Sequence, residues 1–167
     1  MILSASEDGT IKQWDVNSMK CVHTFEYNNS SNNSSKYISS IDVDKTDNWM
    51  IAGGGEKYLT LWNLPTMSIA SYMPTASATN IVKFIEDDSS CRIVSGGNTD
   101  SFLFWKITGH YVSKTGTSKA QSIYSISEAT INNKKVNMLL CPVIKMNLAN
   151  CCCWNFFLAR YTGGSVQ

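Results

Sequence analysis

The chain has little charge and few of the groups on which catalysis usually depends. Of its 167 residues, 16% are Asp, Glu, Lys or Arg, the formal net charge is +1, and there are two histidines. A chain so close to neutral has no basic stripe for binding nucleic acid and no strong field to steer charged ligands. Ser, Thr, Asn and aromatic residues are common instead, and they favour a β protein over a helical one.

Long apolar segments and paired cysteine motifs are also missing. No run approaches the ~20 apolar residues that cross a bilayer, and the first residues lack the pattern of a secretory signal. Six cysteines are present: Cys21, Cys91, Cys141, Cys151, Cys152 and Cys153. Their spacing fits neither a secreted disulfide framework nor a Cys-x-x-Cys zinc site. We therefore expect an intracellular protein with reduced thiols, no metal site, no cofactor and no membrane contact.

The chain does contain a repeat that ends in tryptophan. Trp14, Trp62 and Trp105 each close a short β-type run, and they lie 48 and 43 residues apart. Repeats of ~40–45 residues, each of four short strands, are typical of β-propeller blades. The polar loop 28–36, rich in Asn and Ser, accounts for the longer first interval, and we expect it to be mobile.

The three segments before each tryptophan align: 4–15, 52–63 and 95–106. In each, a small residue ends one strand, a turn follows, and an alternating run leads to the tryptophan. Further strands are predicted over 20–25, 37–43, 49–52, 68–72, 80–85, 91–95, 111–114, 121–127 and 136–140. Gly53-Gly54-Gly55 is interpreted as backbone freedom at a strand end, because the Gly-Lys-Ser/Thr end of a phosphate-binding loop is absent.

These runs predict an all-β fold: a partial propeller of three to four four-stranded antiparallel blades over 1–140, forming an incomplete ring. The first blade is expected to lack its two inner strands. The pattern breaks at Cys141-Pro142, so 141–167 is expected to be a degenerate last blade or an irregular tail. An incomplete ring exposes unpaired strand edges, and we expect these edges to promote self-association.

The run Ser4–Asp15 resembles a WD40 repeat, with Asp8-Gly9 as the inter-strand turn and Trp14-Asp15 as the terminal dipeptide. In that family the turn Asp, a strand hydroxyl, the Trp and an upstream His form a buried hydrogen-bond network. Ser4 or Ser6 would supply the hydroxyl here, whereas no histidine stands at the required place. The resemblance implies that the structural signature of the blades is Asp8, Gly9, Trp14, Asp15, Trp62 and Trp105.

A narrower resemblance is carried by the glycine-rich run Gly53–Leu64, by its spacing to Val94-Ser-Gly-Gly97, and by Phe102–Ile107. Over about 50–127 these segments are similar to the WD40 subunits of the THO complex, which couples transcription to messenger-RNA export. The resemblance implies a non-enzymatic, nuclear scaffold whose partners are other protein subunits and which reaches RNA indirectly.

Two alternatives remain open. A WD40 substrate receptor of a cullin-type ubiquitin ligase, or another protein-interaction scaffold in the cytoplasm, would have the same fold. Such receptors often carry Trp-Asp-x-Arg at the blade end, and the corresponding run here ends in Asn17. An enzyme is the least supported reading, because no nucleophile, base and orienting group come together in the sequence and no catalytic residue is predicted.

Overall fold

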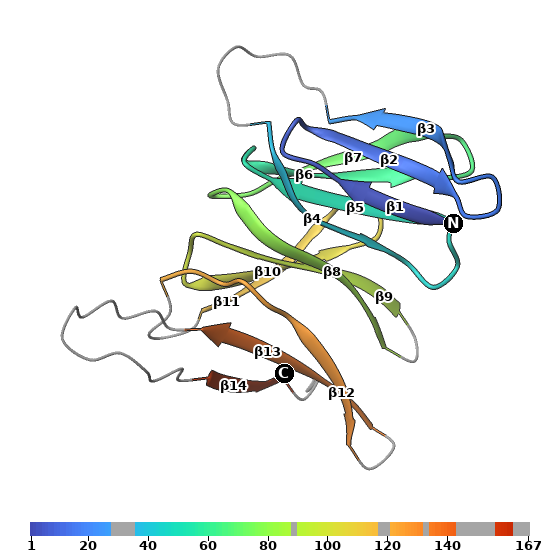
Figure 1. Ribbon diagram of the computed structural model, residues 1–167. Helices are drawn as coiled ribbons and strands as arrows, with labels where there is room; N and C mark the ends of the chain where they lie inside the picture. Colours follow the sequence, from blue (N-terminus) through green and yellow to red (C-terminus); the bar gives the residue numbers. More distant parts are fainter. Residues whose placement is uncertain (28–35, 88–89, 117–120, 132–133, 143–155, 162–167) are drawn as a thin grey trace.

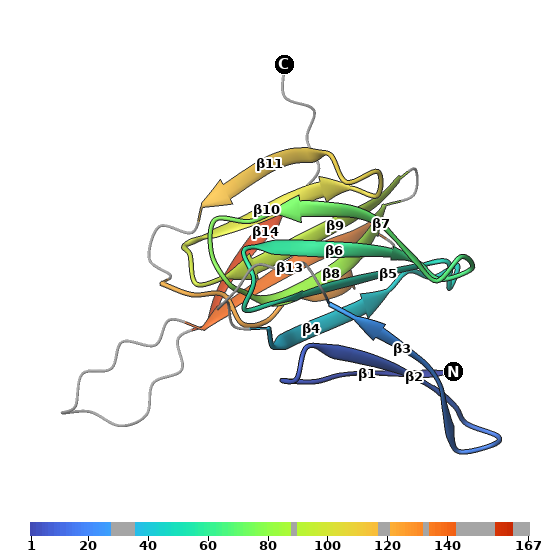
Figure 2. The same ribbon diagram turned by 90° about the horizontal axis from the view of Figure 1, so that it is seen from above.

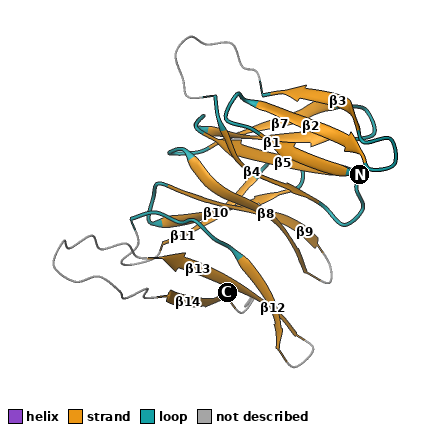
Figure 3. Cartoon of the chain, in the orientation of Figure 1, coloured by secondary structure: helices purple, strands orange, loops and turns teal. Residues whose placement is uncertain are grey.

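The computed structural model describes residues 1–27, 36–87, 90–116, 121–131, 134–142 and 156–161. All the regular structure in these residues is β, as predicted (Figures 1 and 3). None of them forms a helix long and apolar enough to span a membrane. The predicted loop 28–36, apart from Lys36, and Cys151–Cys153 lie outside the described residues.

Four antiparallel sheets follow one another in chain order (Figures 1 and 2). The first contains β1 (Ile2–Ala5), β2 (Thr10–Asp15) and β3 (Lys20–Glu26). The second contains β4 (Ile38–Val43), β5 (Trp49–Gly54), β6 (Tyr58–Asn63) and β7 (Ser68–Pro74). The third contains β8 (Thr79–Asp87), β9 (Ser90–Gly97), β10 (Ser101–Lys106) and β11 (Tyr111–Gly116). The fourth contains β12 (Ser127–Ile131), β13 (Lys134–Pro142) and β14 (Phe156–Tyr161). In each sheet the strands are neighbours in sequence order, which is the up-and-down arrangement of a propeller blade.

The first sheet is more complete than predicted. The register pairs Ser4 with Lys12 in the first sheet, Ala52 with Thr60 in the second and Ser95 with Leu103 in the third. Strand β1 is therefore equivalent to β5 and β9, the second strands of their sheets. The prediction that two inner strands are absent was wrong: within the described residues one strand, the counterpart of β4 and β8, is missing. The strand before the Asp8-Gly9 turn is present as predicted, as the four residues of β1, and the error lay in expecting two further strands before it.

The fourth repeat also differs from its prediction. The strand predicted over 121–127 begins at Ser127, and Gln121–Ile126 has no strand assignment. Ile123 and Ile126 are nevertheless buried against the third sheet, so their apolar spacing reflects packing rather than a ladder. Strand β13 continues through Cys141 and Pro142, where the sequence predicted an interruption. Proline is tolerated at a strand end, because the missing N–H there need not cost a ladder bond.

The core lies between consecutive sheets, and the second and third sheets bury side chains on both faces. Trp62 packs toward the first sheet in a cluster with Ile11, Phe25 and Met50. Leu59 and Leu61, on the opposite face of the same strand, pack toward the third sheet. In the second and third sheets the tryptophan therefore packs toward the preceding sheet, and the alternating run before it packs toward the next part of the chain.

Candidate functional site

The Asp8-Gly9 turn joins β1 to β2 and is held by its own side chains. Asp8 Oδ1 accepts hydrogen bonds from the Thr10 backbone N–H at 2.8 Å and from Thr10 Oγ1 at 2.7 Å. These bonds, the side-chain bond first, hold the pKa of Asp8 below its usual value. Gly9 has a φ of +81°, and a Cβ there would lie 2.8 Å from the carbonyl oxygen of Lys36. Only glycine meets both conditions without strain.

The hydroxyl partner of Trp14 is Ser4 rather than Ser6, since Trp14 Nε1 donates to Ser4 Oγ at 2.9 Å. Asp8 does not join this pair, because its carboxylate binds Thr10. In the third sheet Trp105 Nε1 donates to Ser95 Oγ at 3.3 Å, and this bond is buried. The network of the resembled family is thus reduced here to separate tryptophan–serine pairs.

The tryptophan of the second sheet has no serine partner. The position equivalent to Ser4 and Ser95 is Ala52, which has no acceptor. Trp62 Nε1 is buried and has no hydrogen-bond partner within the described part of the chain. An unmade hydrogen bond of this kind costs free energy of folding, so the second blade carries a defect that the other two avoid.

The residues after Trp14 and Trp62 use their side chains to order the turns that follow. Asp15 accepts backbone N–H groups from Asn17 and Ser18, each at 3.1 Å. Asn63 accepts the N–H of Thr66 at 3.0 Å in the equivalent turn. Hydrogen bonding, chiefly from Ser18, lowers the pKa of Asp15. The acidic residue of the Trp-Asp pair is therefore a turn cap with no partner for acid–base chemistry.

The paired glycines at the ends of β5 and β9 have a different role from the one predicted. Gly53 and Gly54 lie inside β5 without a positive φ, so backbone freedom does not explain them. A Cβ on Gly54 would lie 1.9 Å from the Tyr37 carbonyl oxygen, and one on Gly97 would lie 2.1 Å from that of Ala78. At both sites the incoming innermost strand passes too close for a side chain. Ser6 stands at the equivalent position of the first sheet, where the described residues provide no innermost strand.

Side chains of β4 bind the backbone of the next innermost strand, β8. Asp42 Oδ2 accepts the Phe84 N–H at 2.7 Å, and Ser40 Oγ accepts the Val82 N–H at 3.1 Å. Burial is the main influence on Asp42 and raises its pKa above the usual value, although the Phe84 N–H acts in the opposite direction. Sequence reasoning missed these residues, because a polar face on a strand usually indicates solvent.

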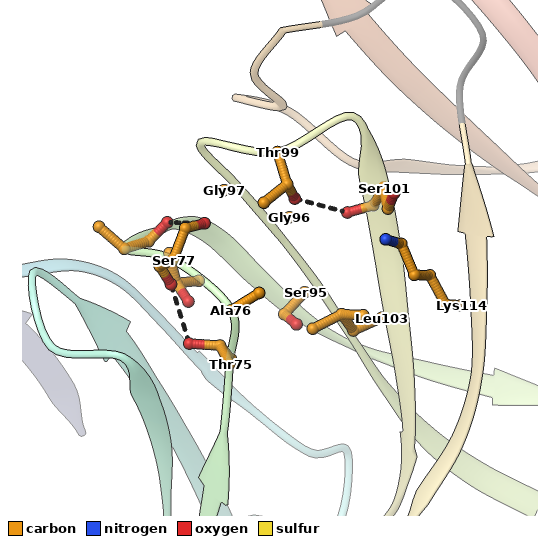
Figure 4. Close-up of a pocket in the computed structure, with 12 residues that line it drawn as sticks. Thr75, Ala76, Ser77, Ser95, Gly96, Gly97, Thr99, Ser101, Leu103 and Lys114 are labelled. Atoms are coloured by element: carbon orange, nitrogen blue, oxygen red, sulfur yellow. Dashed lines mark hydrogen bonds between the residues drawn. The ribbon is translucent and has the colours of Figure 1, made fainter.

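The best-defined hollow near these strands is small. A cavity of about 70 Å³ lies beside the glycine pair of β9, with Ser77, Thr99, Ser101 and Lys114 around it (Figure 4). Three of these hydroxyls already donate, from Ser77 to Ala78 O, from Thr99 to Ser101 O and from Ser101 to Asp100 Oδ1. That volume has room for a few water molecules.

The described residues show no group of three or more His, Cys, Asp or Glu placed to hold a metal ion. His23 packs its ring edge-on against Phe25, and His110 Nδ1 lies 2.9 Å from Thr108 Oγ1 in a turn. Neither pair includes the third group that would orient a catalytic base.

Sheets of up to four antiparallel strands, related by a recurring tryptophan and packed face to face, define this protein as part of a β-propeller. No family model matches the chain. Its sequence is 35% identical to THO complex subunit 6 of Arabidopsis thaliana over 85 residues, which are 51% of this chain and 22% of that protein. It is 30% identical to THO complex subunit 6 of Homo sapiens over 112 residues, which are 65% of this chain and 31% of that protein. The resemblance to THO complex subunits inferred from residues 50–127 is confirmed.

A more distant similarity is to the nuclear distribution protein nudF of Emericella nidulans, 24% identical over 131 residues, or 66% of this chain and 28% of that protein. The chain thus spans less than a third of the length of each of these relatives.

Proposed function

We propose that this chain acts as a non-enzymatic scaffold subunit of a THO-type complex, serving the coupling of transcription to messenger-RNA processing and export in the nucleus. The observation that carries the proposal is the similarity to THO complex subunit 6 from both a plant and an animal, at 30–35% identity over half to two-thirds of the chain. Two finer points belong to it: RNA is reached through protein partners, and the open strand edge pairs with another chain.

The exposed apolar residues support a protein-binding role. Several lie in the turns after the tryptophans and on the outermost strands: Val16, Met19, Val22, Met67, Tyr72, Tyr111 and Val112. Met19 and Met67 occupy equivalent turns at φ of +55° and +52°, a conformation that methionine seldom adopts. Methionine and tyrosine are enriched at protein interfaces, and methionine adapts to varied partner surfaces.

The proposal is tested by affinity purification of the tagged chain from nuclear extract, with the co-purifying proteins identified by mass spectrometry. Recovery of other THO subunits is the expected result. A matched variant, Trp105→Ala, removes a buried tryptophan from the third sheet and should lose these partners together with the fold. Recovery of cullin adaptors instead would favour the ubiquitin-ligase alternative and overturn the proposal.

A further inference from the structure

The outermost strand of each of the first three sheets leaves one side of its backbone unpaired. These strands are β3, β7 and β11, and no strand among the described residues pairs with the side that faces away from the sheet. We call these three sides the outer edges. A row of unpaired N–H and C=O groups is a template for pairing with another chain, so each outer edge is a site at which two copies could join.

Each outer strand contains one extra residue beside the tryptophan of its sheet. Consecutive residues of β2 pair with His23 and Cys21 of β3, so the intervening Val22 has no partner in the ladder. In the second and third sheets the residues left out in the same way are Ala70 and Val112. The pairs β1–β2, β5–β6 and β9–β10 run without such a shift. Because a bulge bends and twists its strand, a straight strand of another chain cannot follow the outer edge past it.

The hydrogen bonds at the end of β3 show which of its backbone groups face outward. The Tyr27 N–H donates to the Gly9 carbonyl at 3.1 Å, and the groups alternate sides along an antiparallel strand. Glu26 and Thr24 therefore direct their N–H groups away from β2. The register places Lys114 of β11 at the position of Thr24. A charged residue thus lies at an outward position of each strand, Glu26 in β3 and Lys114 in β11, and both are exposed.

The second sheet has a proline at such a position. The Thr75 N–H donates to the Lys57 carbonyl at 2.8 Å, so the nitrogen of the preceding Pro74 in β7 faces outward. Proline offers no N–H to a further strand, and at this position it costs the sheet no ladder bond. Bulges, charged residues and proline are separate means of blocking edge pairing. Every outer edge combines a bulge with one of the other two.

From these observations we propose that the three outer edges are closed to strand pairing, and that this closure keeps copies of the chain from associating through them. The residues that close the edges are Val22, Ala70, Val112, Glu26, Pro74 and Lys114. The inference goes beyond the proposed scaffold role, since it concerns a surface that does not pair. It also restricts that role, because a partner that binds the outer strands does so through their side chains.

The proposal is tested in the full chain by giving β11 a regular edge. Deleting Val112 lets Tyr111 and Ser113 pair with consecutive residues of β10 without shifting any other pair, and Lys114→Val removes the charge. We expect this double variant to associate at concentrations roughly tenfold or more below those of the wild-type chain in sedimentation velocity. Hydrogen exchange should slow over β11 in the associated form, because its outward N–H groups become bonded.

Two matched variants separate the edge from other effects. Val112→Ala keeps the number of residues, and hence the bulge, and should associate like the wild-type chain. Lys114→Pro, combined with the same deletion, removes an outward N–H without costing a ladder bond, and should return association to the wild-type level. If the deletion chain with Lys114→Pro associates as strongly as the one with Lys114→Val, the contact does not involve the outer edge and the proposal is wrong.

A third variant tests the closure without a deletion. Glu26→Val, Pro74→Val and Lys114→Val together leave every bulge in place and change exposed positions only. This triple variant should associate at lower concentrations than the wild-type chain, and far-UV circular dichroism checks that each variant stays folded. If the deletion variant is unfolded, the triple variant alone decides. Folded variants that associate no more than the wild-type chain would show that the outer edges need no closure, and would overturn the proposal.

Discussion

At the scale of single residues, the three tryptophans differ in what their indole N–H groups find. Trp14 and Trp105 each donate to a serine ten residues earlier, on the neighbouring strand, whereas Trp62 faces Ala52 at the corresponding place. The strand geometry is shared, so the difference lies in one oxygen atom. The second blade therefore lacks a hydrogen bond that the first and third blades form.

Adding that oxygen should stabilise the protein. We expect Ala52→Ser to raise the free energy of unfolding by about 0.5–1.5 kcal/mol, the net contribution of an intramolecular hydrogen bond, because Trp62 Nε1 gains an acceptor. Urea unfolding monitored by tryptophan fluorescence measures the change. Ala52→Val adds bulk without an acceptor and should destabilise. If serine and valine cost the same, the orphan N–H is not what limits this site.

Removing the oxygen from the third blade should have the reverse effect. Ser95→Ala leaves the buried Trp105 N–H without a partner, at a cost of about 1–3 kcal/mol. Ser4→Ala in the first blade is the matched control, and its cost should be smaller because Ser4 is exposed and water can replace the hydroxyl. Equal losses in the two variants would show that burial does not set the strength of the pair.

At the scale of strands and sheets, the innermost strands are joined by side chains rather than by a ladder. Ser40 and Asp42 of β4 reach the N–H groups of Val82 and Phe84 that face away from β9. The bonds cross from one sheet to the next, so they fix the relative position of two blades.

The pH dependence of Asp42 follows from its burial. The pKa of Asp42 in the folded protein is raised above its ordinary value of 3.8. The free energy of unfolding therefore falls as the pH rises above 3.8 and Asp42 ionises, and it stays lower at neutral pH. Asp42→Asn keeps an acceptor for Phe84 and removes the charge. We expect it to match or exceed the wild-type stability at pH 7, with an advantage that disappears as the pH falls below about 4.

Asp42→Ala removes both the charge and the acceptor, so its comparison with Asp42→Asn isolates the contribution of the acceptor. It leaves the Phe84 N–H unpaired and should lose about 1–3 kcal/mol at pH 7. Urea unfolding of the three proteins at pH 7 and pH 4 gives the comparison. If the alanine and asparagine variants behaved alike at both values, Asp42 would not connect the two sheets.

Most strands could be predicted from the sequence, but the contacts between distant strands could not. Period-two alternation and the tryptophan spacing located β4 to β7 within a few residues, because local patterns determine strands. The close approach of Tyr37 to Gly54 and the bond from Phe84 to Asp42 join residues 17 and 42 positions apart. No local pattern encodes such distances, so the glycines were misread and Asp42 was missed.

At the scale of the whole molecule, each sheet depends on its neighbours for burial, as in other repeat proteins. The first sheet is attached to the second by a shared cluster in which Phe25 meets Trp62 edge-on, with ring centroids 5.1 Å apart. The third sheet takes no part in that cluster. Damage at one interface should therefore remain local.

Phe25→Ala tests this locality. Truncating a fully buried phenylalanine costs about 3–5 kcal/mol, and the loss should fall on the first sheet because Phe25 lies on β3. Hydrogen exchange followed by mass spectrometry should show faster exchange over residues 1–27 and unchanged protection over 92–106. Uniformly faster exchange would instead indicate one cooperative unit spanning the sheets.

The arrangement of the tryptophans has a spectroscopic consequence. One indole sits at an equivalent place in each of the first three sheets, and each has a different environment: exposed serine, no acceptor, buried serine. Hydrogen bonding shifts the indole proton resonance, so a sample labelled with ¹⁵N at tryptophan should give three resolved signals from these residues. Each signal would report the opening of one blade without any added label.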